Sequence, residues 1–145
     1  MIGIIVSGHI NFASGMRSAV EAITGEQEAI EFIDFIPSMT TEELENHMID
    51  SIERINQGEG VLILTDIPGG SPCNRGLSIM LNRNDVKVIA GTNLPMIANA
   101  CFERDGVTLA ELVDIVTDIG HQSIKDMDKE LAQLEAAEPV YQDDL

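Results

Sequence analysis

The chain has 145 residues, of which 44% are hydrophobic and 23% charged, a composition that suits one compact domain with a complete core. Its formal net charge of −17 disfavours binding to nucleic acid or to an anionic membrane, because the surface field repels phosphate groups. The apolar runs are far shorter than a membrane span and no basic leader precedes one, so we expect a cytoplasmic protein without direct membrane insertion.

The first half of the chain alternates strand and helix patterns. Residues 2–6 form a short β-branched run that predicts a strand, and apolar positions on one face of residues 12–24 predict a helix behind it. The same pair returns as a strand over residues 30–35 and a helix that starts near Thr40 and ends at Gly58. Each pair is typical of a βα unit.

The second half continues the alternation. Residues 60–64 are the clearest buried-strand pattern, and residues 72–82 predict a helix with Ser71 as N-cap and Pro72 in the first helical position. Residues 86–90 predict a fourth strand, and two further helices are predicted over 93–104 and 108–119. Repeated βα units predict a three-layer, doubly wound α/β fold with a mostly parallel sheet and helices on both faces.

The last residues predict a separate extension. Apolar side chains recur at helical spacing over residues 121–136, whereas residues 135–145 are acidic and predict a frayed or disordered end. We therefore divide the chain into a domain over residues 1–125 and a C-terminal extension over residues 126–145.

Two predicted strands end in polar residues that could take part in catalysis or ligand binding. His9 ends the first strand and Asp66 follows the third, so both face one crevice if these strands are neighbours. A carboxylate on Nδ1 would fix the tautomer whose Nε2 points outward, as a base, a metal ligand or a nucleophile. Gly69 and Gly70 would allow close backbone approach, and Ser71 at a helix start would expose amide N–H groups that suit a phosphoryl group.

Together, a nucleophile and an anion site indicate phosphoryl transfer through phosphohistidine. From the pattern alone, His9 is equally an exposed loop histidine, Asp66 a turn residue, and residues 69–72 a plain turn and helix start. A Ser-His-Asp hydrolase built from Ser71 is disfavoured because Gly-x-Ser-x-Gly is absent, and neither nucleotide-binding glycine motif is present. Cys73 and Cys101 form no CxxC pair, which gives structural zinc little support. The phosphoryl-transfer scheme itself requires no metal, and we expect no cofactor.

Four segments support a specific resemblance over residues 1–125: IIVSGHINFASGM, GEQEAIEFIDF, GVLILTDIPGGSPCN and VIAGTNLPMIANA. In this order they resemble the IIA component of the mannose-type phosphoenolpyruvate-dependent sugar phosphotransferase system, closest in wording to the N-acetylgalactosamine or galactosamine type. The resemblance implies that His9 accepts a phosphoryl group on Nε2 from the histidine-containing phosphocarrier protein and passes it to a IIB component. It also implies that Asp66 orients the ring and that Ser71 helps to bind the phosphoryl group.

The same resemblance implies a sheet of order 2-1-3-4 and a homodimer in which a C-terminal segment adds an antiparallel strand. The helical spacing after Gly120 does not show that strand and indicates a stand-alone subunit without swapping. Two alternatives stay open: the phosphoryl-donor subunit of a dihydroxyacetone kinase, and a non-catalytic regulatory binding module.

Overall fold

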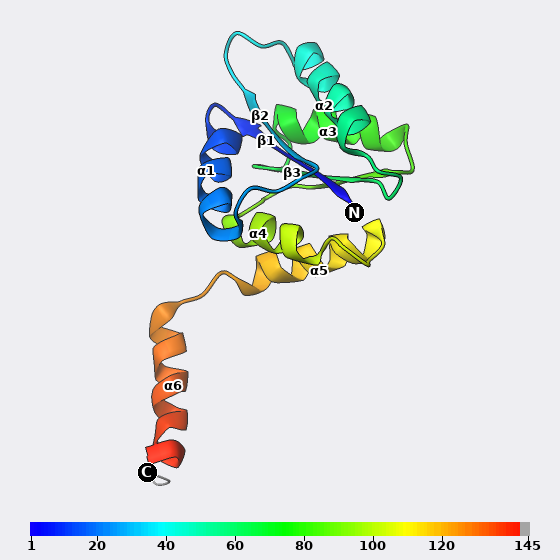
Figure 1. The fold of residues 1–145 in the computed structure, drawn as a ribbon. Coiled ribbons are helices and arrows are strands. Elements are labelled where there is room, and N and C mark those ends of the chain that lie inside the picture. Colours follow the sequence, from blue (N-terminus) through cyan, green and yellow to red (C-terminus); the bar gives the residue numbers. More distant parts are fainter. Residues whose placement is uncertain (143–145) are drawn as a thin grey trace.

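A computed structural model describes residues 1–142 of the chain, with side chains through residue 137. A central sheet lies between two layers of helices (Figure 1). Its strands are all parallel, in the order β2-β1-β3-β4. The strands are β1 (Gly3–His9), β2 (Ile30–Phe35), β3 (Val61–Thr65) and β4 (Val86–Ile89). The helices are α1 (Phe12–Thr24), α2 (Thr41–Ile55), α3 (Ser71–Leu81), α4 (Leu94–Glu103), α5 (Leu109–Gln122) and α6 (Met127–Gln142). The predicted fold class and strand order are confirmed.

Strand alternation divides the core into two. Side chains of β1 and β3 such as Ile4 and Leu62 point to the face covered by α1, α4 and α5, whereas Ile5 and Ile63 point to the face covered by α2 and α3. Every residue of β3 is buried, because this strand lies inside the sheet with helices on both faces. Both central strands are therefore buried along their length, β3 throughout and β1 as far as Gly8.

The helix starts follow the capping signals, with one exception. Thr40 accepts from the Glu43 amide at the start of α2, and Thr108 forms a capping box with Glu111 at the start of α5. The prediction that Ser71 caps α3 is wrong: Gly70 is the N-cap and Ser71 the first helical residue. The shift leaves the serine side chain free of the capping role.

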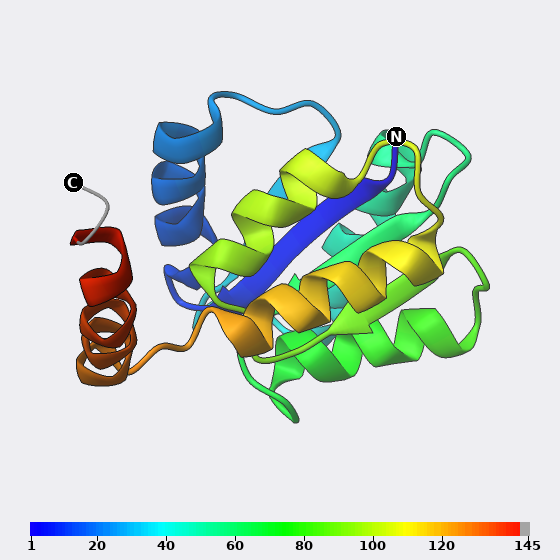
Figure 2. The ribbon, with the colours of Figure 1, turned by 90° about the horizontal axis from the view of Figure 1, so that it is seen from below.

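The C-terminal residues form a helix that leaves the body of the domain. After α5 the chain passes through residues 123–126 into α6, which projects away from the sheet and its helices (Figures 1 and 2). The predicted frayed end is wrong up to Gln142, since α6 continues to that residue; alanine, glutamate and glutamine favour a helix even without a partner surface. The final part of that prediction, residues 143–145, lies outside the described residues.

A buried arginine holds the amino ends of the strands at the edge opposite His9. The side chain of Arg104 is 1% exposed, and its guanidinium donates hydrogen bonds to the carbonyls of Ile2, Glu28 and Ala29. Burial lowers the pKa of Arg104, because desolvation disfavours the charged form. Its role is structural, and nothing in the local sequence pattern predicts it.

Candidate functional site

His9 and Asp66 meet at the carboxyl edge of the sheet because their strands are neighbours. β1 pairs with β3 in a register that sets Ser7 beside Thr65. One carboxylate oxygen, Oδ2 of Asp66, accepts the backbone N–H of His9 at 2.8 Å and lies 2.7 Å from Nδ1 of the same residue. The structure thus brings together the two residues that the strand-end pattern singled out.

This contact fixes which ring nitrogen faces outward. Because the carboxylate accepts a hydrogen bond from Nδ1–H, the lone pair of the neutral ring is left on Nε2. Nε2 has no hydrogen-bond partner in the described part of the chain, and the His9 side chain is 42% exposed. Asp66 is only 11% exposed. The pair therefore consists of a largely buried carboxylate that can orient the ring and an accessible nitrogen that can act as a nucleophile.

The carboxylate of Asp66 is held in its charged form. Partial burial alone would raise the pKa of Asp66, but hydrogen bonds from the His9 backbone, the His9 ring and the Ile67 amide outweigh this effect and lower the pKa. An ionised acid on Nδ1 also stabilises positive charge on the ring. Such charge develops when Nε2 forms a new bond.

Gly70 lies directly against the histidine ring. A Cβ at this position would come within 2.8 Å of Cε1 of His9 and 3.1 Å of Cγ1 of Ile67. Gly69, at φ +82°, takes a left-handed conformation that favours glycine. This close approach explains why a glycine, rather than the following serine, occupies the N-cap of α3.

The start of α3 offers hydrogen-bond donors next to this ring. No hydrogen bond within residues 1–142 uses the amides of Ser71 and Cys73 or the hydroxyl of Ser71. Asn74 donates from its side chain to the carbonyl of Gly69 at 3.1 Å and so fixes the turn. Free amides at a helix N-terminus favour an anion, both as donors and through the helix dipole.

One neighbour of the ring, and one close contact of the residue before His9, escaped the sequence patterns. The ring of Phe35, at the end of β2, packs edge-to-face on His9 with centroids 5.9 Å apart. A Cβ at Gly8 would lie 2.4 Å from Cδ1 of Phe12, so the residue before the histidine must be small. Phe35 could have been predicted as a neighbour of His9 from the pairing of β1 with β2, but a single sequence does not reveal which strands pair or in which register.

The site has no cationic side chain of its own. The segments that follow the strands at this edge, residues 9–16, 36–41, 66–74 and 90–94, contain neither lysine nor arginine. The nearest arginines along the chain have acidic partners: Arg17 pairs with Glu21 at 2.9 Å, and Arg75 lies 3.8 Å from Glu45. Among the described residues, no group of three or more His, Cys, Asp or Glu could hold a metal ion. An anion here would be held by backbone amides and a hydroxyl.

Residues 3–117 match the protein family described as the PTS system fructose IIA component. The chain belongs to this EIIA-man family. The resemblance carried by the four sequence segments is thereby confirmed, and the chain is a IIA component of a sugar phosphotransferase system.

Individual members of the EIIA-man family differ in length. The mannose-specific EIIAB component of Escherichia coli (strain K12) is 32% identical over 125 residues, which make up 86% of this chain but only 39% of that protein. The sorbose-specific EIIA component of Lacticaseibacillus casei is 31% identical over 110 residues, or 76% of this chain and 79% of that one. The chain thus spans less than half of the first relative and most of the second.

A solved EIIA structure has the same fold. The phosphotransferase system component EIIA from Streptococcus agalactiae superposes with a TM-score of 0.83 at 32% identity, covering 89% of this chain and 99% of that chain. The agreement spans almost all of the solved protein. This EIIA-man member therefore has the fold of that EIIA component.

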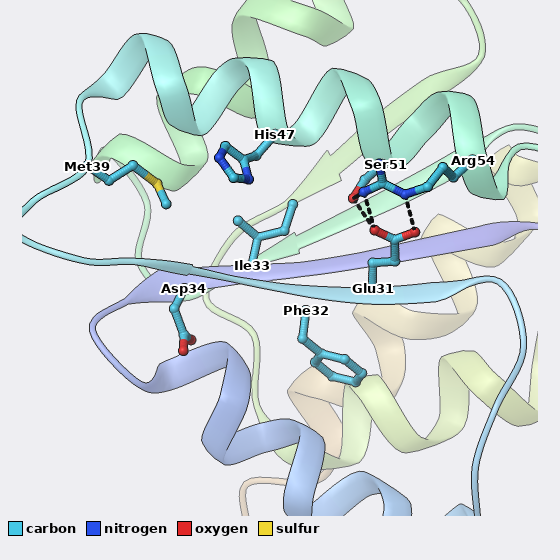
Figure 3. Close-up of a pocket in the computed structure, with 8 residues that line it drawn as sticks. All are labelled: Glu31, Phe32, Ile33, Asp34, Met39, His47, Ser51 and Arg54. Atoms are coloured by element: carbon cyan, nitrogen blue, oxygen red, sulfur yellow. Dashed lines mark hydrogen bonds and ion pairs between the residues drawn. The ribbon is translucent and has the colours of Figure 1, made fainter.

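Two cavities of about 290 Å³ each lie along β2, away from the histidine. The first lies between β2 and α2, where Glu31 binds Ser51 and Arg54 (Figure 3). His47 also lines it, but Asp34 points to the opposite side of the strand and therefore does not orient that ring (Figure 3). His9 and Asp66 line neither cavity. In this EIIA-man member the candidate site therefore lies at the surface and not in a cavity of this size.

Proposed function

We propose that His9 is the phosphoryl-carrying residue of this IIA component. In this scheme Nε2 accepts a phosphoryl group from the histidine-containing phosphocarrier protein and passes it to a IIB component during sugar uptake, in the cytoplasm. The single observation that supports this role most strongly is the contact of 2.7 Å between Nδ1 of His9 and the carboxylate of Asp66. The contact keeps a proton on Nδ1 and leaves the lone pair of the neutral ring on Nε2, at the surface.

The transfer needs only one bond to form and one to break. The lone pair on Nε2 of His9 attacks the phosphorus of the donor phosphohistidine, the phosphorus–nitrogen bond of the donor breaks, and its electron pair returns to the donor ring. The Nδ1 proton stays on His9, and the phosphorylated ring is cationic. Asp66 stabilises that cation, and the reverse sequence of events delivers the phosphoryl group to the acceptor.

The start of α3 would hold the phosphoryl oxygens. The amides of Ser71 and Cys73 and the Ser71 hydroxyl are free to donate, and Gly70 lets them approach the ring. Preformed donors of this kind cost no reorganisation during the reaction. Gly69 provides the left-handed turn that places them.

The oligomeric state of the protein and its division into a domain and an extension also belong to the proposal. We expect a homodimer, with residues 1–125 as the phosphocarrier domain and residues 126–145 as an extension, as the family resemblance implies. None of the helices within residues 1–142 is long and apolar enough to cross a membrane.

The test is phosphorylation of the purified chain by phosphoenolpyruvate, enzyme I and the phosphocarrier protein, read by intact mass. Wild type should gain one acid-labile phosphoryl group and His9→Ala none. His47→Ala is the matched control, because His47 is an exposed histidine outside the site, and it should be phosphorylated like wild type. An unmodified wild type would refute the proposal. Onward transfer to a IIB protein, rather than to nucleotide bound by a dihydroxyacetone kinase, separates the two carrier functions, and absence of transfer to either favours a regulatory module.

A further inference from the structure

Strand β2 forms one edge of the sheet, and its outer side carries unpaired backbone groups. The carbonyls of Ala29 and Phe35 accept hydrogen bonds from β1, so the residues between them alternate between facing β1 and facing outward. The outward positions are Ile30, Phe32 and Asp34, and no hydrogen bond within residues 1–142 uses their backbone amides or carbonyls. Such a row of free donors and acceptors is a template for another strand.

The opposite edge of the sheet, β4, is less suited to pairing. It has four residues and carries the exposed Lys87, and lysine is a residue by which natural edge strands block pairing. Strand β2 has six residues and neither lysine nor proline. Its only charges are the acids Glu31 and Asp34, which repel an acidic strand but attract a basic one.

The two cavities along β2 lie on opposite faces of this edge. Glu31 and Ile33 point to the face of the first cavity, under α2, whereas Phe32 points to the other face (Figure 3). The second cavity lies on that other face, against Arg17 and Glu21 of α1. Successive residues of a strand point to opposite faces, so neighbouring side chains of an added strand would enter one cavity each.

The walls of the two cavities suit uncharged side chains. Each cavity contains one arginine that already has an acidic partner: Arg17 pairs with Glu21 at 2.9 Å, and Arg54 pairs with Glu31 at 2.7 Å. The other walls combine apolar surface with amide or hydroxyl groups, from Ile30, Phe32 and Gln27 in one cavity and from Ile33, Met39 and Ser51 in the other. Valine and threonine fit such surroundings, and both also favour a strand.

The charge around β2 indicates which chain would pair with it. Glu26 and Glu28 are exposed just before the strand, and neither they nor Asp34 form an ion pair within residues 1–137. A second copy of this chain would bring the same carboxylates to the edge, whereas a basic segment would be complementary to them. The observations therefore favour another, basic protein over self-pairing.

We propose that β2 binds an extended segment of another protein as an additional edge strand, with uncharged β-branched side chains in the two cavities and basic residues at the ends of the segment. Main-chain hydrogen bonds would supply affinity, and the cavities would supply specificity. This inference goes beyond the proposed function, because His9 and Asp66 line neither of these cavities.

The test is NMR of the nitrogen-labelled chain with the end-blocked peptide Lys-Thr-Val-Thr-Val-Lys. We expect a Kd below about 1 mM and slower solvent exchange of the outward amides of Ile30, Phe32 and Asp34. The free amides of Ser71 and Cys73 are the internal control and should exchange as they do without peptide. Absence of binding, or contacts elsewhere, would overturn the proposal. Protection of the β2 amides without peptide, rising with protein concentration, would overturn it in favour of self-pairing.

Methylation of the peptide backbone distinguishes strand addition from simple charge attraction. Only every second residue of an edge strand donates to its neighbour, so N-methyl groups on one alternate set of residues should raise the Kd at least about tenfold, and on the other set should change it little. Equal effects of the two methylated peptides would contradict strand addition. Glutamate in place of both lysines should also raise the Kd at least about tenfold. Because the peptide binds without phosphoryl transfer, these results are independent of whether His9 is phosphorylated.

Discussion

Gly70 lies so close to His9 that any side chain at position 70 would contact the reactive ring: a Cβ there would be 2.8 Å from Cε1. We therefore predict that Gly70→Ala turns the ring away from Asp66 and lowers the rate of His9 phosphorylation about 10- to 100-fold, because small displacements of a nucleophile are costly. The measurement is the single-turnover rate with phosphorylated donor protein.

Gly15→Ala provides the control for this substitution. Gly15 lies inside α1, and an added Cβ there meets nothing within 4 Å. This variant should transfer phosphoryl groups like wild type and be more stable by about 0.5–1 kcal/mol, because alanine favours helix over glycine. Equal transfer rates for both glycine variants would contradict the proposed tight fit.

Asp66→Asn removes the charge and keeps the shape of the orienting side chain. An amide can donate to Nδ1 as well as accept from it, so the variant should populate the tautomer that has its proton on Nε2. We expect phosphoryl transfer at least about tenfold slower than in wild type. Nitrogen NMR of the His9 ring would report the tautomer directly, and a wild-type rate would show that Asp66 does not orient the ring.

The same residue predicts a pH dependence of stability. Hydrogen bonds to its carboxylate lower the pKa of Asp66 in the folded state, so its stabilising effect is complete above the unfolded-state pKa of about 3.9 and is lost as pH falls through the folded-state value. Asp66→Asn should therefore be less stable than wild type at neutral pH, and the difference should shrink below about pH 4. Urea unfolding of both proteins across this range is the measurement. A difference that stays constant with pH would exclude the carboxylate as its source.

Arg104→Met should destabilise the domain without touching the site. The variant leaves the carbonyls of Ile2, Glu28 and Ala29 without their buried donor, which should cost about 2–4 kcal/mol. The exposed pair formed by Arg17 supplies the control, since Arg17→Met should leave the free energy of unfolding nearly unchanged. Chemical denaturation gives both values, and similar losses for the two variants would contradict the structural role of Arg104.

The sequence alone predicted those features that depend on local pattern. The period of the apolar residues predicted the βα units, and the position of His9 and Asp66 at the ends of two strands predicted their meeting, given that the strands are neighbours. The strand order itself came from the family resemblance, because hydrophobic periodicity does not determine which strands pair.

Features that depend on contacts between distant segments were missed. The expected Ser71 cap was one residue late because the ring of His9, far away in sequence, requires glycine at position 70. Phe35 reaches the site only through the pairing of β1 with β2, and Arg104 satisfies carbonyls about 75 to 102 residues away along the chain. The extent of α6 does not follow from its acidic composition, because the alanine, glutamate and glutamine residues in it favour a helix.

One oxygen of Asp66 binds His9 twice, through the backbone N–H and through the ring. The ring is thereby tied to the strand that bears it, and its two side-chain torsions have little freedom left to lose when a partner arrives. In the proposed function, a donor protein and then an acceptor protein must each find Nε2 of His9 in the same position. A doubly bound histidine at the end of a buried strand provides that constancy without any movement of the fold.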